Sequence, residues 1–334
     1  MPANLDKISR RQALGGAVAL AGALGTFGGT RFAAAQDAGM AEGPLVWLAM
    51  DQRGLDDAYN QRAYAPAFDA HLARRAARNE AALARLPAPK NFAYGARPIE
   101  KLDVHLADLG GRANAPINIY FHGGAWRGGV ARGSTWVAEP YVNAGAHCVI
   151  PEYSSVPDVG GDLAVLGDEV RRAVAWVYEH AAEFGGDPQR IHISGHSSGG
   201  HLAAVVLTTD WAGEFGLPAD FIKGGAIACG MFDLEPVRLS SRSEYVAFTD
   251  EIEDELSPQR HLDRLTAPLI LGYGTLETPE FQRQSRDFAA AVRAAGKPVD
   301  LLVAEGCYHL EVEQTLANPY GLLGRALHEQ MGLV

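Results

Sequence analysis

The sequence predicts an α/β fold: a mostly parallel, doubly wound sheet with helices on both faces and a small cap. Short apolar runs typical of strands alternate along the chain with amphipathic segments of helix length. Such alternation builds parallel sheets that are covered on both faces. In addition, Gly195-His196-Ser197-Ser198-Gly199 stands where one apolar run gives way to a helical segment, as in a sharp strand-to-helix turn.

The expected strands and helices follow from the spacing of apolar residues. We expect strands at residues 104–106, 117–121, 148–151, 191–194, 222–228, 269–273 and 299–303. Helices are expected at residues 163–184, 198–208, 279–295 and 319–330. A helical pattern over residues 43–86, ended by a proline-rich turn, predicts N-terminal cap helices within residues 43–90. Residues 231–265 are too long for a simple connection and predict a second cap or lid insertion.

Residues 1–35 have the features of an export signal rather than of the fold. Arg10 and Arg11 precede a short, glycine-rich apolar stretch, and Ala33-Ala34-Ala35 offers small residues for cleavage before Gln36. This pattern is similar to a twin-arginine signal. We therefore expect a periplasmic or secreted protein whose single domain covers residues 36–334. An uncleaved membrane anchor is the alternative, although the apolar stretch is short for a span.

Composition bounds the possible partners. With 334 residues, 47% of them hydrophobic, the chain can bury a large core. Its formal net charge of −11 argues against nucleic acid or an anionic membrane surface as a partner, and favours a soluble enzyme with a small-molecule substrate. Cys148, Cys229 and Cys307 are an odd set. We expect buried free thiols, with one disulfide remaining open. The sequence leaves the oligomeric state open.

Ser197 is the candidate nucleophile. A serine hydroxyl attacks a carbonyl only when a tight turn exposes it and a base activates it. Gly195 and Gly199 leave room for such a turn. The sequence alone also permits a chance match, because the chain contains 38 glycines.

The candidate base and its carboxylate follow later in the chain, each on a loop after an expected strand. His309 stands after the last strand, and Glu277 stands in the preceding loop, just before a helix. A Ser, acid, His order is the one found in doubly wound hydrolases. His309 as a helix cap and Glu277 as an acid at a helix N-terminus are the structural alternatives. Glu280 and Glu305 are the competing acids.

A glycine loop offers donors for a developing oxyanion. The strand at residues 117–121 runs directly into His122-Gly123-Gly124-Ala125-Trp126. The backbone N–H groups of Gly123 and Gly124, with that of Ser198 as a third, are the candidate oxyanion hole.

Several other side chains are candidates for the pocket. Trp126 and Tyr153 follow strand ends and are candidate walls of a substrate pocket, although core packing is equally compatible. His196 is a third candidate because it neighbours Ser197. His192, His196 and His201 span strand, turn and helix, so they share no metal-ligand face. We expect no metal and no organic cofactor.

Taken together, these segments resemble the α/β-hydrolase superfamily, and within it the hormone-sensitive-lipase-like esterases and the arylformamidases. The resemblance covers roughly residues 92–334. It rests on the runs His122-Gly123-Gly124-Ala125-Trp126, Ser194-Gly195-His196-Ser197-Ser198-Gly199-Gly200-His201-Leu202, Phe232-Asp233-Leu234-Glu235-Pro236, Glu277-Thr278-Pro279-Glu280-Phe281 and His309-Leu310-Glu311-Val312. The first two runs are shared by many esterases, whereas the third and fourth look more like the arylformamidases.

The resemblance implies a triad of Ser197, Glu277 and His309, with Gly123, Gly124 and Ser198 shaping the oxyanion hole. Two departures stand out. The acid is more often Asp in such enzymes, so Glu277 must bring a longer side chain to the same place. Many relatives also carry an aromatic residue where this chain has Ala125.

We therefore expect an exported serine hydrolase that cleaves small or aryl carboxylic esters through an acyl-enzyme. An arylformamidase or a related amidase that uses the same residues is the second hypothesis. Kynurenine formamidases act inside the cell, whereas we expect this chain to be exported. A non-catalytic binding protein on the same fold is the third. It fits less well, because all three triad types and the glycine loop are present in the expected order.

Overall fold

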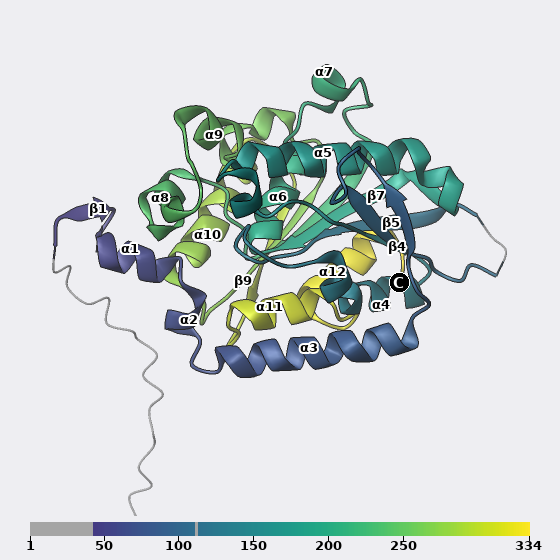
Figure 1. Ribbon diagram of the computed structural model, residues 1–334, viewed down its shortest axis with the longest axis horizontal. Coiled ribbons are helices and arrows are strands. Elements are labelled where there is room, and N and C mark those ends of the chain that lie inside the picture. Colours follow the sequence, from purple (N-terminus) through teal and green to yellow (C-terminus); the bar gives the residue numbers. More distant parts are fainter. Residues whose placement is uncertain (1–42, 111–112) are drawn as a thin grey trace, which may run out of the picture. The chain divides into compact units, whose positions relative to one another are not determined.

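A computed structural model describes residues 43–110 and 113–334 of the chain (Figure 1). The expected export signal lies outside the described residues. The centre is an eight-stranded sheet with the strand order β10-β9-β8-β7-β5-β6-β4-β3. Its strands are β3 (Lys90–Ala93), β4 (Lys101–His105), β5 (Ala115–Phe121), β6 (His147–Pro151), β7 (Gly186–His196), β8 (Ile222–Ala228), β9 (Leu269–Gly274) and β10 (Val299–Ala304).

The sheet is parallel except at one edge. The pairings from β6 through β5, β7, β8 and β9 to β10 are all parallel, whereas β4 runs antiparallel to both β6 and β3. Every residue of β5 and β6 is buried, as continuous apolar strands between two helical layers should be. The prediction of a mostly parallel α/β fold is confirmed.

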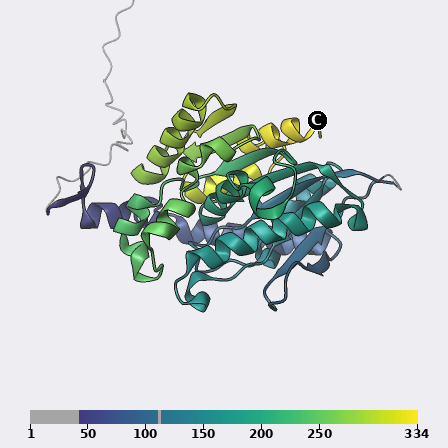
Figure 2. The same ribbon diagram turned by 90° about the horizontal axis from the view of Figure 1, so that it is seen from above.

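Each of the seven expected strands corresponds to a strand of this sheet, with ends that differ by up to five residues. The pattern missed β3, whose residues are largely exposed and therefore lack an apolar run. Seen from above, the blue β3–β4 hairpin and the olive helix α10 lie at opposite sides of the sheet (Figure 2).

Helices cover both faces of the sheet. Figure 1 shows α5 and α6 above it and α4 and α12 below it, and α6 packs on β7 while α12 packs on β8. The helices after β5 are α4 (Thr135–Asn143), α5 (Leu163–His180), α6 (Ser198–Leu207), α7 (Trp211–Phe215), α8 (Glu235–Leu239), α9 (Asp250–Glu255), α10 (Pro279–Ala294), α11 (His309–Leu316) and α12 (Leu322–Met331).

Local chemistry sets where the long helices begin. The Asp162 side chain accepts a hydrogen bond from the N–H of Ala164 at the start of α5. Thr278 caps α10 in the same way, and Pro279 occupies the first helical position, where its missing N–H has no cost.

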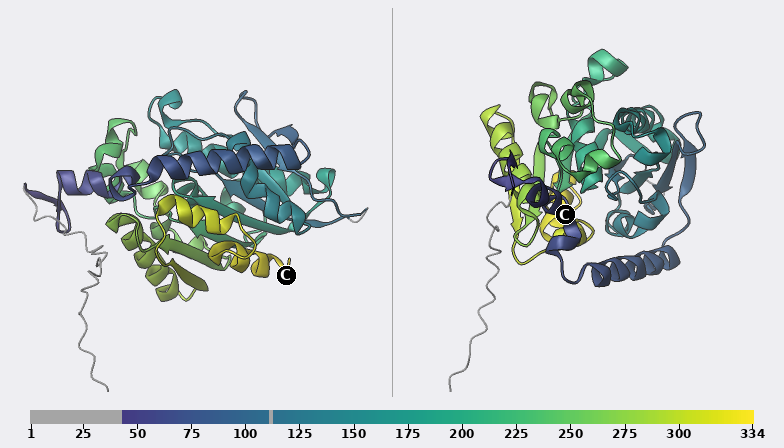
Figure 3. Two further views of the ribbon diagram at one scale, coloured as in Figure 1. Left: turned by 90° about the horizontal axis from the view of Figure 1, so that it is seen from below. Right: turned by 60° about the vertical axis from the view of Figure 1, so that its left-hand side comes forward.

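The N-terminal segment is more broken than its helical pattern suggested. It forms a two-stranded hairpin, β1 (Leu45–Trp47) and β2 (Met50–Asp51), followed by α1 (Gln52–Ala58), α2 (Gln61–Tyr64) and α3 (Phe68–Arg85). Ala65, which precedes Pro66, has an extended backbone that ends α2. Helix α3 then runs beside α11 and α4 (Figure 3, left).

Residues 231–265, expected as a cap or lid insertion, connect β8 to β9 through α8, α9 and several short 3₁₀ turns. This segment contacts helix α6 through a hydrogen bond between His201 Nε2 and the Leu256 carbonyl, at 2.8 Å. Among the described residues, no helix combines the length and the apolar character needed to cross a bilayer.

Four buried histidines are held in their neutral form. Burial lowers the pKa of His105, His192 and His201 to about 4 and that of His196 to about 3. In the unfolded chain, these side chains take up protons near pH 6.5. Between about pH 6.5 and pH 4, the unfolded state therefore binds more protons than the folded state, and stability falls as the pH falls.

Replacing His105 with leucine should weaken this pH dependence. Neither ring nitrogen of His105 has a hydrogen-bond partner among the described residues, so His105→Leu removes a titrating group without breaking a hydrogen bond. Between pH 6 and pH 4.5, the slope of the free energy of unfolding against pH should then be smaller than in the parent by about 1 kcal/mol per pH unit. Urea unfolding at several pH values measures both slopes, and equal slopes in the two proteins would contradict the prediction.

Candidate active site

Ser197 lies on a strained turn between β7 and α6. Its backbone has φ 58° and ψ −125°, a conformation that L residues rarely adopt and that concentrates at functional sites. The neighbouring glycines are required by space. A Cβ atom on Gly195 would lie 2.4 Å from the Gly199 oxygen, and one on Gly199 would lie 2.2 Å from the Phe121 oxygen. The turn expected from Gly-x-Ser-x-Gly is therefore present, with Ser197 at its tip.

His309 and Glu277 meet through a direct hydrogen bond. His309 Nδ1 lies 2.5 Å from Glu277 Oε1, and Glu277 Oε2 accepts from the Gly274 N–H at 2.9 Å. Both side chains are buried. The bond at Nδ1 leaves Nε2 as the ring nitrogen free to take a proton. His309 begins helix α11 rather than lying in a loop.

The two competing acids are engaged elsewhere or exposed. Glu280 lies in α10, where it pairs with Arg283 at 2.7 Å and accepts from the Tyr59 hydroxyl. Glu305 is exposed. Of the three carboxylates considered, Glu277 is therefore the one in contact with His309.

Three unpaired backbone N–H groups surround the Ser197 turn. Within residues 43–110 and 113–334, no backbone acceptor takes a hydrogen bond from the N–H of Gly123, Gly124 or Ser198. Ser198 is the first residue of α6, where an N–H has no partner within the helix. Gly123 approaches the turn closely, since a Cβ atom placed on it would lie 3.2 Å from Ser197 Cβ. The arrangement offers donors to an oxygen bound beside Ser197.

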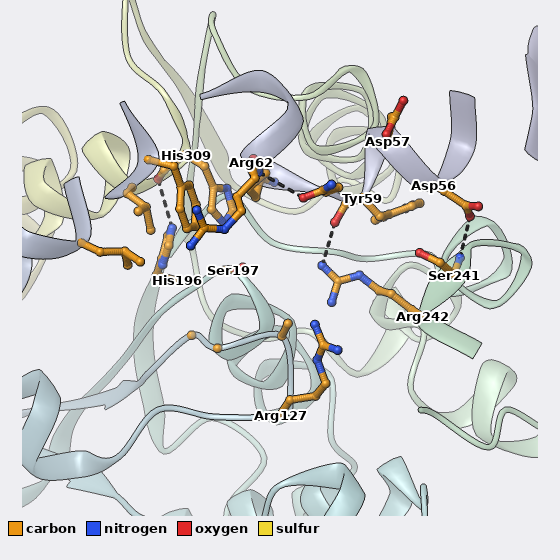
Figure 4. Close-up of a pocket in the computed structure, with 18 of the residues that line it drawn as sticks. Asp56, Asp57, Tyr59, Arg62, Arg127, His196, Ser197, Ser241, Arg242 and His309 are labelled. Carbon is orange, nitrogen blue, oxygen red and sulfur yellow. Dashed lines mark hydrogen bonds between the residues drawn. The ribbon is translucent and has the colours of Figure 1, made fainter. Parts of the chain in front are cut away.

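A cavity of about 570 Å³ opens in front of Ser197 (Figure 4). Ser197, His309 and His196 line it together with Gly123 and Gly124. Helices α1, α2 and α3 and the 3₁₀ turn Ser241–Glu244 supply much of the remaining wall. The N-terminal segment and the insertion after β8 therefore both shape the space that a substrate would fill.

Trp126 and Tyr153 are not among the residues that line this cavity. The Tyr153 ring stacks on His122 at 4.4 Å, and its hydroxyl donates to the His122 carbonyl. Trp126 packs edge-on against His201 at 5.0 Å. Both side chains are buried, and their contacts pack the glycine loop against the protein interior.

A buried charged cluster behind His309 escaped the sequence analysis. Glu313 accepts from the Tyr120 hydroxyl at 2.7 Å and lies 3.5 Å from Arg75 and 3.6 Å from His196 Nδ1. Burial alone would raise the pKa of Glu313, but Arg75 and the Tyr120 hydroxyl together hold it below its ordinary value. His196 Nε2 in turn contacts the His309 carbonyl at 3.1 Å. The cluster thereby steadies the start of α11.

A signal for part of this cluster exists in the sequence. Glu313 is four residues after His309, so the two share a face once a helix begins at His309. The partners Tyr120 and Arg75 lie far away in sequence and carry no comparable signal.

Among the described residues, one group of possible metal ligands lies close together: His196, Cys229 and His309, with ligand atoms all within 4.8 Å of one another. The protonation and hydrogen bonds of these side chains do not favour metal binding. Burial, with Glu277 nearby, raises the pKa of the Cys229 thiol, and His309 Nδ1 and His196 Nε2 are already in contact with oxygen atoms. Cys148, Cys229 and Cys307 are all free, the first two buried and Cys307 half-buried.

The glycine loop yields a matched pair of variants. Gly124 has φ 140°, and a Cβ atom on it would lie 2.0 Å from the Gly128 oxygen, whereas a Cβ on Gly128 meets nothing within 4 Å. Gly124→Ala should therefore cost about 2–3 kcal/mol of stability or displace the loop, while Gly128→Ala should stay within about 1 kcal/mol of the parent. Chemical denaturation of both variants measures the difference. Equal stabilities would refute the strained-loop interpretation.

The chain is similar in sequence to known hydrolases. The chain is 29% identical to the kynurenine formamidase of Danio rerio over 86% of this chain and 98% of that protein. It is 30% identical to the kynurenine formamidase of Salmo salar, over 72% of this chain and 81% of that protein. Esterase LipQ of Mycobacterium tuberculosis is 30% identical over 57% of this chain and 48% of its own length.

A solved structure and a family model point the same way. Esterase 2 of Thermogutta terrifontis superposes with a TM-score of 0.62 at 23% identity, covering 75% of this chain and 97% of that one. This likeness shows the fold. The family model BD-FAE matches residues 102–220, which contain β5, the glycine loop and the Ser197 turn. The chain belongs to the α/β-hydrolase superfamily, in the branch of hormone-sensitive-lipase-like esterases and arylformamidases, and is a hydrolase.

Proposed function

We propose that the protein is a serine hydrolase in which Ser197 is the nucleophile, His309 the base and Glu277 the carboxylate that orients it. The observation that carries the proposal is the convergence of independent elements on one cavity. The strained Ser197, the two glycines of the loop and His309, whose Nδ1 is held by a buried carboxylate, all line it. The N–H groups of Gly123, Gly124 and Ser198 have no backbone acceptor among the described residues. Each has a defined task in acyl transfer.

The proposed reaction begins with attack of Ser197 Oγ on the substrate carbonyl while His309 Nε2 takes the hydroxyl proton. The N–H groups of Gly123, Gly124 and Ser198 hold the negative oxygen of the tetrahedral intermediate. His309 then returns the proton to the leaving oxygen or nitrogen, which leaves an acyl-enzyme. Water, activated by His309 in the same way, releases the acid and restores Ser197. Glu277 keeps Nδ1 protonated and stabilises the imidazolium formed in each half-reaction.

Small or aryl carboxylic esters are the first proposed substrates, because ester cleavage makes the smaller demand on the leaving group. Esterase LipQ is a relative with a matching name, although the chain spans only about half of its length. Formamides are the second candidate class. The specific observation in their favour is that the match to the Danio rerio kynurenine formamidase covers nearly all of that protein.

Parallel initial rates distinguish the two classes. For the chain beginning at Gln36, we expect turnover of a short-chain aryl ester, with Ser197→Ala lowering kcat by about 10⁴-fold or more. The same two proteins are assayed on N-formylkynurenine. Circular dichroism of Ser197→Ala checks that the fold is retained. Undiminished turnover by a folded Ser197→Ala variant would overturn the proposal, and a higher kcat/KM for the formamide would move the substrate to the arylformamidase class.

We further propose that the protein is exported through a twin-arginine signal and acts in the periplasm or outside the cell. The support is Arg10-Arg11 before a weakly apolar, glycine-rich stretch, with small residues at Ala33-Ala34-Ala35. Kynurenine formamidases act inside the cell. A periplasmic or extracellular location therefore favours the ester hypothesis.

Replacing Arg10 and Arg11 together by lysine should retain the full-length chain in the cytoplasm, because such signals are read through the paired arginines. Cell fractionation followed by mass spectrometry of the N-terminus measures both location and cleavage. The parent chain should be recovered from the periplasm or medium with Gln36 first. A parent chain found uncleaved in the cytoplasm would contradict export.

A further inference from the structure

A buried guanidinium in the cavity wall lacks an acidic partner. Arg242 is 6% exposed. Its Nη1 donates to the Tyr245 hydroxyl at 2.9 Å and its Nη2 to the Tyr59 carbonyl at 3.3 Å, while Nε donates to no described atom. The Trp126 and Tyr59 rings lie 5.4 and 5.8 Å from it. All of these neighbours are neutral, and among the described residues no carboxylate forms an ion pair with Arg242.

A second cationic side chain lies close to Arg242. Arg127, which follows the glycine loop, is exposed and lies over the Tyr245 ring at 4.2 Å. It too has no ion-pair partner in the part of the chain that the structure describes. Tyr245 therefore contacts both cations, with its ring under Arg127 and its hydroxyl on Arg242. Figure 4 shows the two guanidinium groups near one another in the cavity wall, to one side of Ser197.

The other charged residues of the wall do not neutralise this pair. Arg62 and Arg75 also line the cavity, but each has its own carboxylate, Asp69 at 2.8 Å and Glu313 at 3.5 Å respectively. The acids in the lining are Asp56, Asp57 and Glu244. Asp56 accepts from the Ser241 N–H at 2.6 Å, Glu244 is exposed, and none of the three pairs with Arg127 or Arg242.

Burying a charge without a counterion is costly, and a protein retains one where a ligand completes it. The planar guanidinium fork matches the geometry of a carboxylate through two parallel hydrogen bonds. We propose that Arg242 and Arg127 form a subsite for a carboxylate on the substrate. The enzyme then selects acyl compounds that carry a negative charge away from the bond it cleaves. This inference rests on the proposed hydrolase function and names a substrate class for it.

Matched substrates test the subsite. The first pair is 3-acetoxybenzoate and its neutral isostere 3-acetoxybenzamide, which place the charge on the leaving group. The second is monophenyl adipate and the phenyl ester of adipamic acid, which place it on the acyl group. The parent enzyme should favour the charged member of at least one pair by about tenfold or more in kcat/KM. Arg127→Gln and Arg242→Gln should each lower that ratio by about tenfold.

Arg62→Gln is the matched control, because it removes one positive charge from the same wall but from an arginine already paired with Asp69. It should leave the ratio unchanged. An equal fall in Arg62→Gln, or a ratio near one in the parent for both pairs, would overturn the subsite. If the parent shows a ratio near one but still hydrolyses both neutral esters, the subsite is wrong and the hydrolase function stands. If no substrate shows hydrolysis that depends on Ser197, the hydrolase function itself is wrong.

Binding without turnover provides an independent readout. In the Ser197→Ala background, calorimetry with the charged member of the pair that the parent prefers should show a Kd about tenfold weaker when Arg127→Gln is added. Arg127 is exposed, so this variant stays informative even where Arg242→Gln fails to fold. An unchanged Kd would overturn the contribution of Arg127 and, with it, the two-arginine subsite.

Discussion

The close backbone contact between the β7–α6 turn and the end of β5 is the constraint on which the site depends. A Cβ on Gly199 would come within 2.2 Å of the Phe121 oxygen and 2.3 Å of the His122 oxygen, so no larger residue fits between them. Because both partners are backbone, the relative position of Ser197 and the glycine loop is set by two adjacent parallel strands. The nucleophile and the candidate oxyanion donors are therefore held by the sheet itself.

The features closest to this contact were also the ones that the sequence predicted. Strands β5 and β7 read as apolar runs because both of their faces are buried, and Gly-x-Ser-x-Gly marks a turn that only small neighbours permit. Glu277 and His309 could be proposed because parallel strands bring their carboxyl ends to one edge. The pattern cannot show that an edge strand such as β3, with solvent on most of its residues, pairs at all.

What the sequence could not predict is the set of contacts that joins distant segments. Charged residues are normally read as exposed, yet Glu313 and Arg242 are buried because residues far along the chain surround them. For Trp126 and Tyr153, the sequence left two interpretations open, pocket wall and core packing. Their positions after strand ends suggested the pocket, but large aromatic side chains also suit the space behind a glycine loop, where tertiary packing put them.

Helix α3 has two roles whose combination matters for how the protein assembles. Its residues close part of the cavity, and its Arg75 faces the buried Glu313 near the opposite end of the chain. Contacts between such distant segments require the chain to lose the entropy of a long loop. The cavity is thus complete only once this long-range contact has formed. Hydrolytic competence would then be acquired only when the whole polypeptide has folded, and partly folded chains would remain inert.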